Sequence, residues 1–175
     1  YCDWYLELSK PVLNGDSSPA AKAGTRRTLL RVLEAMLRLM HPIMPYISEE
    51  IWQRVKVLVG KTGESIMLEA YPVADNSKIN LEAEADVEWL KSVIAGIRNI
   101  RGEMNISPSK QLPVLFHNSS ATDQQRLQRY SSQLRFLARL ESLDVLAIDA
   151  DLPPAATALV GNMAVLVPLK GFIDK

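Results

Sequence analysis

The sequence has few of the residues that usually carry catalysis or cross-linking. It contains one cysteine, Cys2, and two histidines, His41 and His117. A single cysteine excludes an internal disulfide and a cysteine-based zinc site, and it suits a reducing compartment. Gly-rich phosphate loops, Gly-x-Ser-x-Gly and clusters of metal-ligating residues are also missing from the sequence. We therefore expect no catalytic residue, no metal site and no cofactor site in this chain.

Neither an excess of charge nor a long apolar run distinguishes the chain. The 20 Lys and Arg residues balance the 20 Asp and Glu residues, so a nucleic-acid site must come from the local arrangement of charge. No run of about 18 apolar residues occurs, which predicts that no helix spans a membrane. No signal peptide is visible. With 175 residues, the chain can bury a core in one domain or in two small ones.

Residues 40–52 are the most informative segment, because they end one helix and begin another. Pro42 cannot donate a helix hydrogen bond and disfavours the α conformation at His41, so the preceding helix should end here. Ser48 is expected to cap the next helix, with acidic residues in its first turn. The segment therefore predicts a rigid corner between two packed helices.

Three segments have the apolar periodicity of helices. In residues 21–40, apolar side chains recur at intervals of four, three and four residues, which is typical of a bundle helix. Residues 81–104 have a similar pattern and predict a second long helix. A shorter segment from about residue 4 follows helical spacing until Pro11. Helices are therefore expected to dominate the chain.

Strand signals begin in the middle of the chain. Strands are expected at residues 65–69 and 112–116, where Pro113 indicates either an edge strand or the beginning of a strand. A capping box that starts at Ser120 predicts one helix with a single apolar face. Further strands are expected at residues 143–148, 158–160 and 163–167, the last two joined by a Gly161-Asn162 turn.

The predicted fold class is mostly α and α+β overall. We expect residues 1–60 to form part of a helical bundle and residues 65–170 to form a small α+β domain with a hairpin. The first residues already follow helical spacing without a capping residue before them, so we expect the chain to be part of a longer protein.

Three segments of the sequence resemble a known family. Residues 40–52, Met-His-Pro-Ile-Met-Pro-Tyr-Ile-Ser-Glu-Glu-Ile-Trp, resemble the anticodon-binding helical domain of the class I synthetases for valine, isoleucine, leucine and methionine. Residues 2–10 and 97–108 are similar to segments of the valyl-tRNA synthetases in particular. Isoleucyl-tRNA synthetase is the alternative, because the motif in residues 40–52 is shared.

The resemblance implies a function for the longer protein and for this segment. The longer protein would be a cytoplasmic, monomeric ligase that joins valine to its tRNA through an aminoacyl-adenylate, with ATP and magnesium bound elsewhere. The family's His-x-Gly-His and Lys-Met-Ser-Lys-Ser motifs are missing from this sequence, which implies that this segment is not catalytic. Its partners would be valine tRNA and the catalytic and editing domains of the same chain, without a membrane. A segment like residues 171–175 leads into a helical hairpin in this family, so truncation at both ends is implied.

Basic residues on the first long helix are candidates for contact with the tRNA. Residues 22–38 contain five basic residues and one acidic residue, an excess of four positive charges. Arg27, Arg31 and Arg38 are expected on one side of the helix, where they would face a phosphate backbone. The alternative is an ordinary solvated charged face.

The second long helix offers another candidate edge. Arg98, Arg101 and Asn105 repeat at helical spacing, and Lys91 extends the edge by two turns. Arginine binds phosphate bidentately or stacks on a base, and asparagine can hydrogen-bond a base edge. The alternative for these residues is salt bridging within the domain, with Glu103 as a partner.

A different class of function is a structural module that docks onto the catalytic body and barely touches RNA. Binding through several phosphates weakens steeply as salt rises, whereas docking to an apolar surface does not. Salt dependence therefore separates the two functions.

Overall fold

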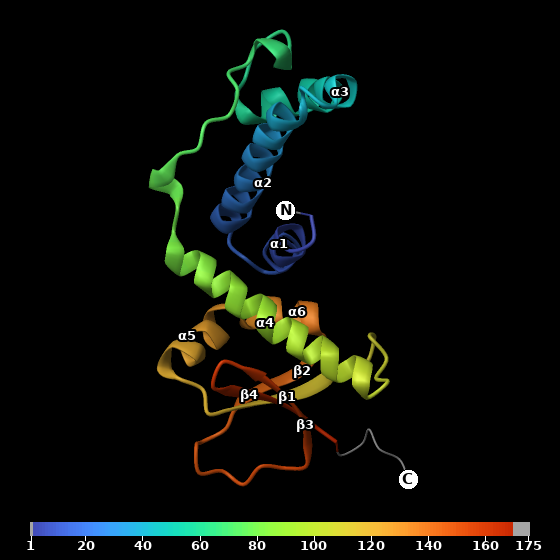
Figure 1. Ribbon diagram of the computed structural model, residues 1–175, viewed down its shortest axis with the longest axis vertical. Helices are drawn as coiled ribbons and strands as arrows, with labels where there is room; N and C mark the ends of the chain where they lie inside the picture. Colours follow the sequence, from blue (N-terminus) through green and yellow to red (C-terminus); the bar gives the residue numbers. More distant parts are fainter. Residues whose placement is uncertain (1, 170–175) are drawn as a thin grey trace. The chain divides into compact units, whose positions relative to one another are not determined.

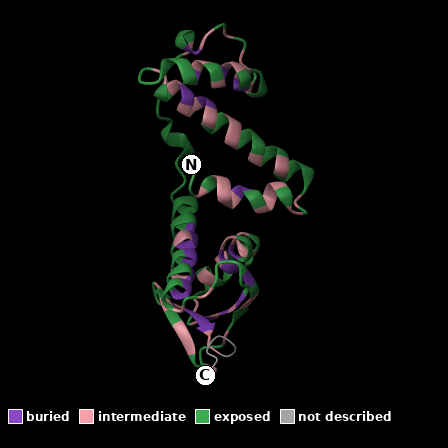
Figure 2. Cartoon of the chain, turned by 90° about the vertical axis from the view of Figure 1, so that its right-hand side faces the viewer, coloured by how far each residue is buried: buried purple, intermediate pink, exposed green. Residues whose placement is uncertain are grey.

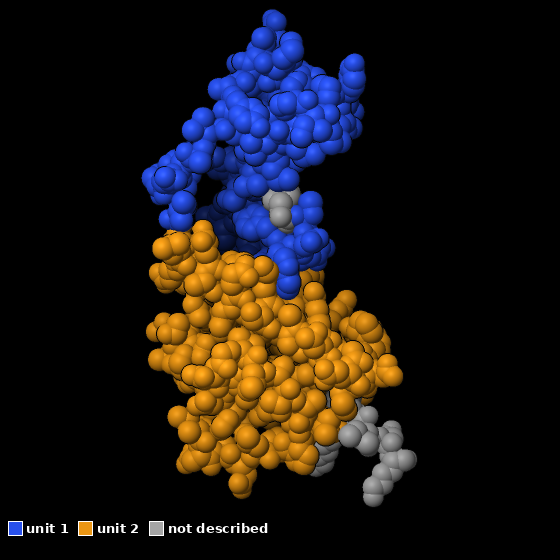
Figure 3. All heavy atoms as spheres, in the orientation of Figure 1, with its two compact units in different colours: residues 1–79 blue, residues 80–175 orange. Residues whose placement is uncertain are grey.

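The chain forms two compact units in a computed structural model that describes residues 2–169. The units are Tyr1–Ile79 and Asn80–Lys175 (Figure 3). The boundary lies later than the expected one near residues 60–65, because the segment after residue 60 packs back onto the first unit. Residue 170, the expected end of the second domain, and residues 171–175 lie outside the described part of the chain. None of the helices between residues 2 and 169 contains an apolar stretch that could span a membrane.

The first unit is helical, as expected for residues 1–60 (Figure 1). It contains α1 (Tyr5–Asn14), α2 (Pro19–Met40), α3 (Pro45–Val55) and the short 3₁₀ helices η1 (Lys56–Val59), η2 (Ile66–Leu68) and η3 (Asn76–Lys78). The strand expected at residues 65–69 is wrong, since η2 occupies this position. The Ser65 hydroxyl accepts a hydrogen bond from the Met67 N–H and caps this short helix, so a local cap overrides the strand propensity.

Helix boundaries in the first unit follow capping and proline rules. The Ser18 hydroxyl accepts a hydrogen bond of 3.2 Å from the Ala21 N–H, and Pro19 occupies the first helical position of α2. Helix α1 continues past Pro11, where it was expected to stop. The Pro11 carbonyl still accepts a hydrogen bond from the Gly15 N–H at 3.0 Å, because proline lacks only the donor.

The corner between α2 and α3 forms as predicted, but Ser48 is not the cap of α3. This helix begins at Pro45, since proline suits the first helical position. Ser48 is only 2% exposed. Its hydroxyl donates to the Met44 carbonyl at 2.6 Å and lies 2.8 Å from Nδ1 of His41, the C-cap residue of α2. Ser48 therefore ties the first turn of α3 to the end of α2.

The core of the first unit is small and joins three of its elements. Leu37, Trp52 and Ile66 form the buried cluster, and Leu33 and Ile51 pack against it. These residues come from α2, α3 and η2. Trp52 is completely buried, so the segment around Ile66 is anchored to the two helices.

The second unit is a small α+β domain, in agreement with the prediction. It contains α4 (Leu81–Glu103), β1 (Leu112–His117), α5 (Ala121–Arg129), α6 (Ser131–Ala138), β2 (Leu140–Val145), β3 (Ala155–Val160) and β4 (Met163–Pro168). The strand order is β2-β1-β4-β3. Strands β1 and β2 are parallel, and the other pairs are antiparallel.

Helix α4 packs its apolar face against the sheet. Leu90, Ile94 and Ile97 are at most 1% exposed, and Figure 2 shows buried residues along the side of α4 that faces the strands. The approach is close at Gly96, where an added Cβ would lie 3.1 Å from the Ala158 Cβ on β3. A Cβ at this position would require α4 or Ala158 to shift by a few tenths of an ångström.

Several details of the second unit differ from the prediction. Of the two alternatives for Pro113, the beginning of a strand is confirmed and an edge position is wrong: β1 is an inner strand, and its ladder register shifts between Leu112 and Pro113. The single helix expected from Ser120 is divided at Tyr130 into α5 and α6. The strand expected at residues 143–148 begins earlier, at Leu140.

Two local predictions in the second unit are confirmed. The Ser120 hydroxyl accepts from the Asp123 N–H at 3.1 Å, and the Asp123 carboxylate accepts from the Ser120 N–H at 2.9 Å, which completes the capping box. Gly161 has φ of 59° in the turn between β3 and β4, a conformation that glycine adopts without steric cost.

A buried aspartate joins α4 to α5. Asp86 is 4% exposed, and its carboxylate accepts hydrogen bonds from Arg126 at 2.7 Å, Tyr130 at 2.9 Å and Arg129 at 3.1 Å. Nearby, the Trp89 indole N–H donates to Asp123 at 2.8 Å. The two helices are therefore held together by charged and polar contacts in addition to apolar packing.

Candidate nucleic-acid interface

The first unit has a groove along one side of α2. Its volume is about 1280 Å³, and α2, η1 and the segment 71–78 contribute to its walls. The lining contains one acidic residue, Glu34. The basic residues that line it are Arg26, Arg27, Arg31, Arg38, Lys61 and Lys78. A concentration of positive charge in a groove is the electrostatic footprint of a nucleic-acid site.

Three arginines supply the uncompensated charge of the groove. Arg26, Arg27 and Arg31 are exposed and lie within about two turns of α2. Within residues 2–169, no ion pair involves any of the three guanidinium groups. The structure therefore places Arg27 and Arg31 on an exposed side of α2, as expected, and adds Arg26 beside them. Their contact with RNA stays a prediction.

Arg38 does not share the exposed position predicted for it with Arg27 and Arg31. Its side chain is 18% exposed, and Nε and Nη2 each lie 2.8 Å from a carboxylate oxygen of Glu34. Nη1 donates to the Ala70 carbonyl at 2.6 Å. The bidentate pair with a carboxylate one turn away turns the side chain inward. Arg38 thus connects α2 to the chain segment that forms the opposite wall of the groove.

Glu34 organises this end of the groove. Besides the Arg38 pair, its carboxylate accepts a hydrogen bond from the Trp52 indole at 3.1 Å and lies 3.8 Å from Lys61 Nζ. Burial alone would raise the pKa of Glu34, but the hydrogen bonds from Arg38 and Trp52 outweigh it and lower the pKa. Lys61 also pairs with Glu69. The charges here compensate each other, so the net positive charge of the groove lies at Arg26, Arg27 and Arg31.

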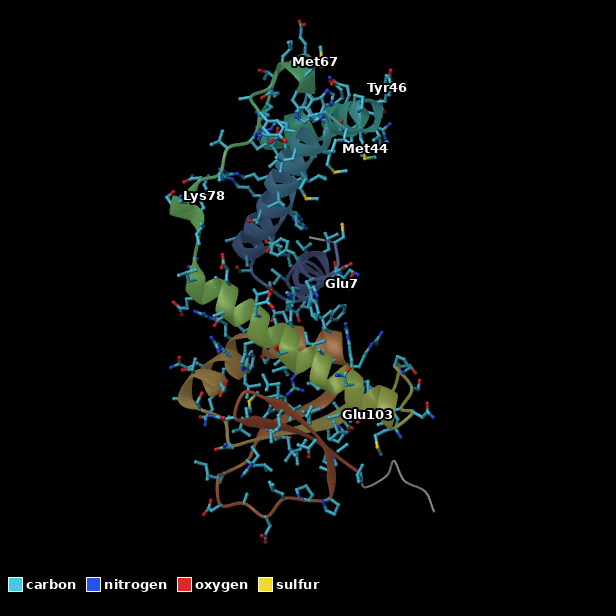
Figure 4. All side chains as sticks on the ribbon, viewed as in Figure 1. Glu7, Met44, Tyr46, Met67, Lys78 and Glu103 are labelled. Atoms are coloured by element: carbon cyan, nitrogen blue, oxygen red, sulfur yellow. The ribbon has the colours of Figure 1, made fainter. Side chains whose placement is uncertain are left out.

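The opposite wall comes from a segment without regular periodicity. Tyr71 is 60% exposed, and its hydroxyl lies 3.5 Å from the Leu39 carbonyl. Lys78, labelled in Figure 4, pairs with Asp75 at 2.9 Å. Hydrogen bonds from Ser77 and Lys78 lower the pKa of the exposed Asp75 to about 2. Sequence reasoning missed this wall, because no spacing rule relates residues 71–78 to α2.

Arg101 is not on an exposed edge of α4. It is 7% exposed. Nη1 donates to the Ser107 carbonyl at 3.1 Å, and Nη2 donates to the carbonyls of Ala138 at 2.9 Å and Arg139 at 3.1 Å. Burial lowers the pKa of Arg101, and the nearby Arg139 adds to the effect. The expected exposed edge is wrong at this position, because Arg101 holds two loops together.

The other candidates on α4 differ among themselves. Arg98 is exposed. Lys91 pairs with Glu88 at 2.7 Å, which is salt bridging within the domain, although the partner is not the expected Glu103. Asn105 has φ of 52° just after α4, and the following N–H, of Ile106, donates to the Arg101 carbonyl at 2.9 Å. Asn105 thus has a role in ending the helix, since asparagine tolerates this conformation.

The basic groove and the helical unit that contains it are typical of a nucleic-acid-binding module. The chain belongs to the family described as the anticodon-binding domain of tRNA ligase, whose model matches residues 1–116. It is also similar to the valine--tRNA ligase of Xanthomonas campestris pv. campestris (strain B100), with 47% identity over 176 residues, covering 99% of this chain. The chain spans 18% of the length of that relative. The resemblance to the valyl-tRNA synthetases is confirmed, and the isoleucyl alternative is not favoured.

Proposed function

We propose that this chain is the anticodon-binding segment of a valine–tRNA ligase and that the groove along α2 holds the anticodon stem and loop of valine tRNA. The observation that carries the proposal is a set of three exposed guanidinium groups, those of Arg26, Arg27 and Arg31, which form no ion pair within residues 2–169 and line a groove whose one acidic residue is compensated. Aminoacylation, with ATP and magnesium, would take place in the rest of the longer protein.

The chemistry of the groove suits a phosphate backbone. Guanidinium groups bind phosphate oxygens through paired hydrogen bonds. Phosphate contacts fix the orientation of a nucleic acid and supply salt-dependent affinity. The segment would thus contribute binding energy and position the tRNA, without taking part in the reaction.

The test is a double variant, Arg27→Ala with Arg31→Ala, whose affinity for a valine tRNA transcript is measured from low to near-physiological salt. If the variant loses two phosphate contacts, it should bind the tRNA roughly tenfold more weakly at low salt. The magnitude of the slope of log K against log salt should fall by about two. The matched control is Arg54→Ala, since Arg54 is an exposed arginine of α3 that pairs with Glu50 at 2.6 Å and does not line the groove.

Three results would be informative. A folded double variant with unchanged affinity and slope would contradict the role of the groove. A loss of affinity in the double variant alone, and not in the Arg54 control, would support it. An anticodon-swapped transcript then separates base reading from backbone support, because only base reading makes affinity depend on the anticodon.

One observation favours a docking role in addition to RNA binding. The corner between α2 and α3 exposes large apolar side chains: Ile43 is 84% exposed and Tyr46 is 90% exposed. Figure 4 labels Tyr46 and Met44 at this corner. Exposed apolar patches mark contacts with other proteins, and the rest of the longer ligase would be the partner. Affinity for that partner should depend little on salt, in contrast to tRNA binding.

A further inference from the structure

Arg139 has a backbone conformation that its side chain does not favour. It is the C-cap residue of α6, with φ of 53° and ψ of 58°. Glycine is the usual residue in this left-handed conformation at a helix end, because a Cβ is disfavoured there. The Arg139 side chain is exposed, and within residues 2–169 no ion pair or side-chain hydrogen bond involves its guanidinium group. The contacts of the fold therefore do not account for an arginine at this position.

The surroundings of Arg139 are positively charged. The buried Arg101 donates to the Arg139 carbonyl at 3.1 Å, and the charge of Arg139 acts on Arg101. Within the described chain, Arg101 has backbone carbonyls as partners and no carboxylate. The acidic residues near them in sequence, Glu103 and Glu141, are exposed and form no ion pair with either arginine in residues 2–169. Two adjacent cations thus lack a compensating acid.

A loop rich in hydroxyl groups lies beside the two arginines. The Leu112 N–H donates to the Arg139 carbonyl at 3.1 Å, which places the end of this loop next to Arg139. The exposed hydroxyls of Ser107 and Ser109 lie 2.8 Å apart. Hydroxyl groups can donate to phosphate oxygens, and Arg101 connects the loop that carries them to Arg139 through the Ser107 and Arg139 carbonyls.

We propose that Arg139 binds a phosphate group of the RNA backbone, as a second contact in the unit Asn80–Lys175 that is separate from the groove along α2. Arg101 supports it by holding the Arg139 backbone in place and by adding positive charge. The inference rests on the proposed function, because the RNA would be the tRNA held by the groove. A guanidinium group without a carboxylate partner suits a phosphate, since the pairing is bidentate and charge-assisted.

The test is Arg139→Gly in the full chain. Glycine suits the left-handed backbone, so the thermal stability should stay the same or rise. Affinity for the valine tRNA transcript should fall roughly fivefold at low salt, and the slope of log K against log salt should fall by about one. Arg139→Lys keeps the positive charge but not the bidentate pairing, so it should restore the salt slope and only part of the affinity. Asn118→Gly is the control for the backbone, since Asn118 also has a positive φ of 56° and carries no charge; because its Nδ2 donates to the Asn162 carbonyl at 2.9 Å, this variant is compared only for tRNA affinity and salt slope, not for stability.

The outcomes distinguish this inference from the proposed function. If Arg139→Gly leaves affinity and slope unchanged while the double variant of Arg27 and Arg31 weakens binding, the Arg139 contact is wrong and the groove stands. If neither variant weakens binding, both are wrong. Titration with inorganic phosphate separates the two possible sources of the ligand. Saturable phosphate binding that Arg139→Gly abolishes, with no change in tRNA binding, would show a site for a small anion and overturn the RNA contact.

Discussion

Replacing Arg101 by alanine should destabilise the unit Asn80–Lys175. The substitution removes one guanidinium group that donates to the carbonyls of Ser107, Ala138 and Arg139 at 3.1, 2.9 and 3.1 Å. Ser107 lies in the loop after α4, Ala138 is the last residue of α6, and Arg139 connects α6 to β2. The change therefore releases two connections from the helix at once, and both connections lead into strands of the sheet.

The magnitude follows from the contacts of this side chain. Each hydrogen bond from a charged donor contributes about 1.5 kcal/mol when it is partly buried, so three contribute about 4.5 kcal/mol. Removing a buried cation without a carboxylate partner restores part of this free energy. We expect the unfolding free energy to fall by about 3 kcal/mol. Arg98→Ala changes an exposed arginine of the same helix, and the loss of an exposed contact costs about 0.2 to 1 kcal/mol.

Hydrogen exchange is the suitable assay, because it reports on each unit separately. Amides of α4 and β1 that exchange only by unfolding of this unit should exchange about a hundredfold faster in Arg101→Ala, since each 1.4 kcal/mol corresponds to about a factor of ten. Amides of α2 and α3 serve as the internal control. Equal exchange rates in Arg101→Ala and Arg98→Ala would refute the structural role of Arg101 and favour an exposed role in RNA binding.

Two further predictions concern α4 and α5. Burial alone would raise the pKa of Asp86, but hydrogen bonds from Arg126, Tyr130 and Arg129 outweigh burial and lower the pKa. The ionised Asp86 therefore stabilises the folded unit fully above the unfolded-state pKa of about 3.9. This contribution to the unfolding free energy is lost as the pH falls through the lower folded-state pKa. Urea unfolding of the wild type should show this loss, and Asp86→Asn should remove that part of the pH dependence. Ser120→Ala should lower the unfolding free energy by about 1 kcal/mol through loss of the capping box, and wild-type stability in chemical denaturation would contradict it.

Sequence patterns predicted the elements whose signals are local. The apolar periodicity of residues 81–104 predicted α4 with an error of one residue at its end. The spacing of Ser120 and Asp123 predicted where α5 begins. Near Ser48 two start signals compete, and a proline at the first helical position takes precedence over a later serine. Where only one local start signal is present, the sequence predicts where the helix begins.

The orientation of the arginines is set by distant parts of the chain. Arg38 turns toward the Ala70 carbonyl, and Arg101 turns toward the Ala138 carbonyl. Helical spacing describes which residues share a face, but backbone carbonyls that arrive from other elements decide which of them point inward. For this reason Arg27 and Arg31 lie on the exposed side of α2 as predicted, whereas Arg38 and Arg101 do not lie on the exposed faces expected for them.

The strand order has a consequence for the synthesis of this protein. Strand β4 is the last of the strands between residues 2 and 169, yet it lies between β1 and β3 in the sheet. While the ribosome is still making residues 163–168, β1 lacks one neighbour and the apolar face of α4 lacks part of its cover. We therefore expect the nascent chain to expose part of the apolar face of α4 until β4 has been made, an interval in which chaperones that bind apolar segments can act.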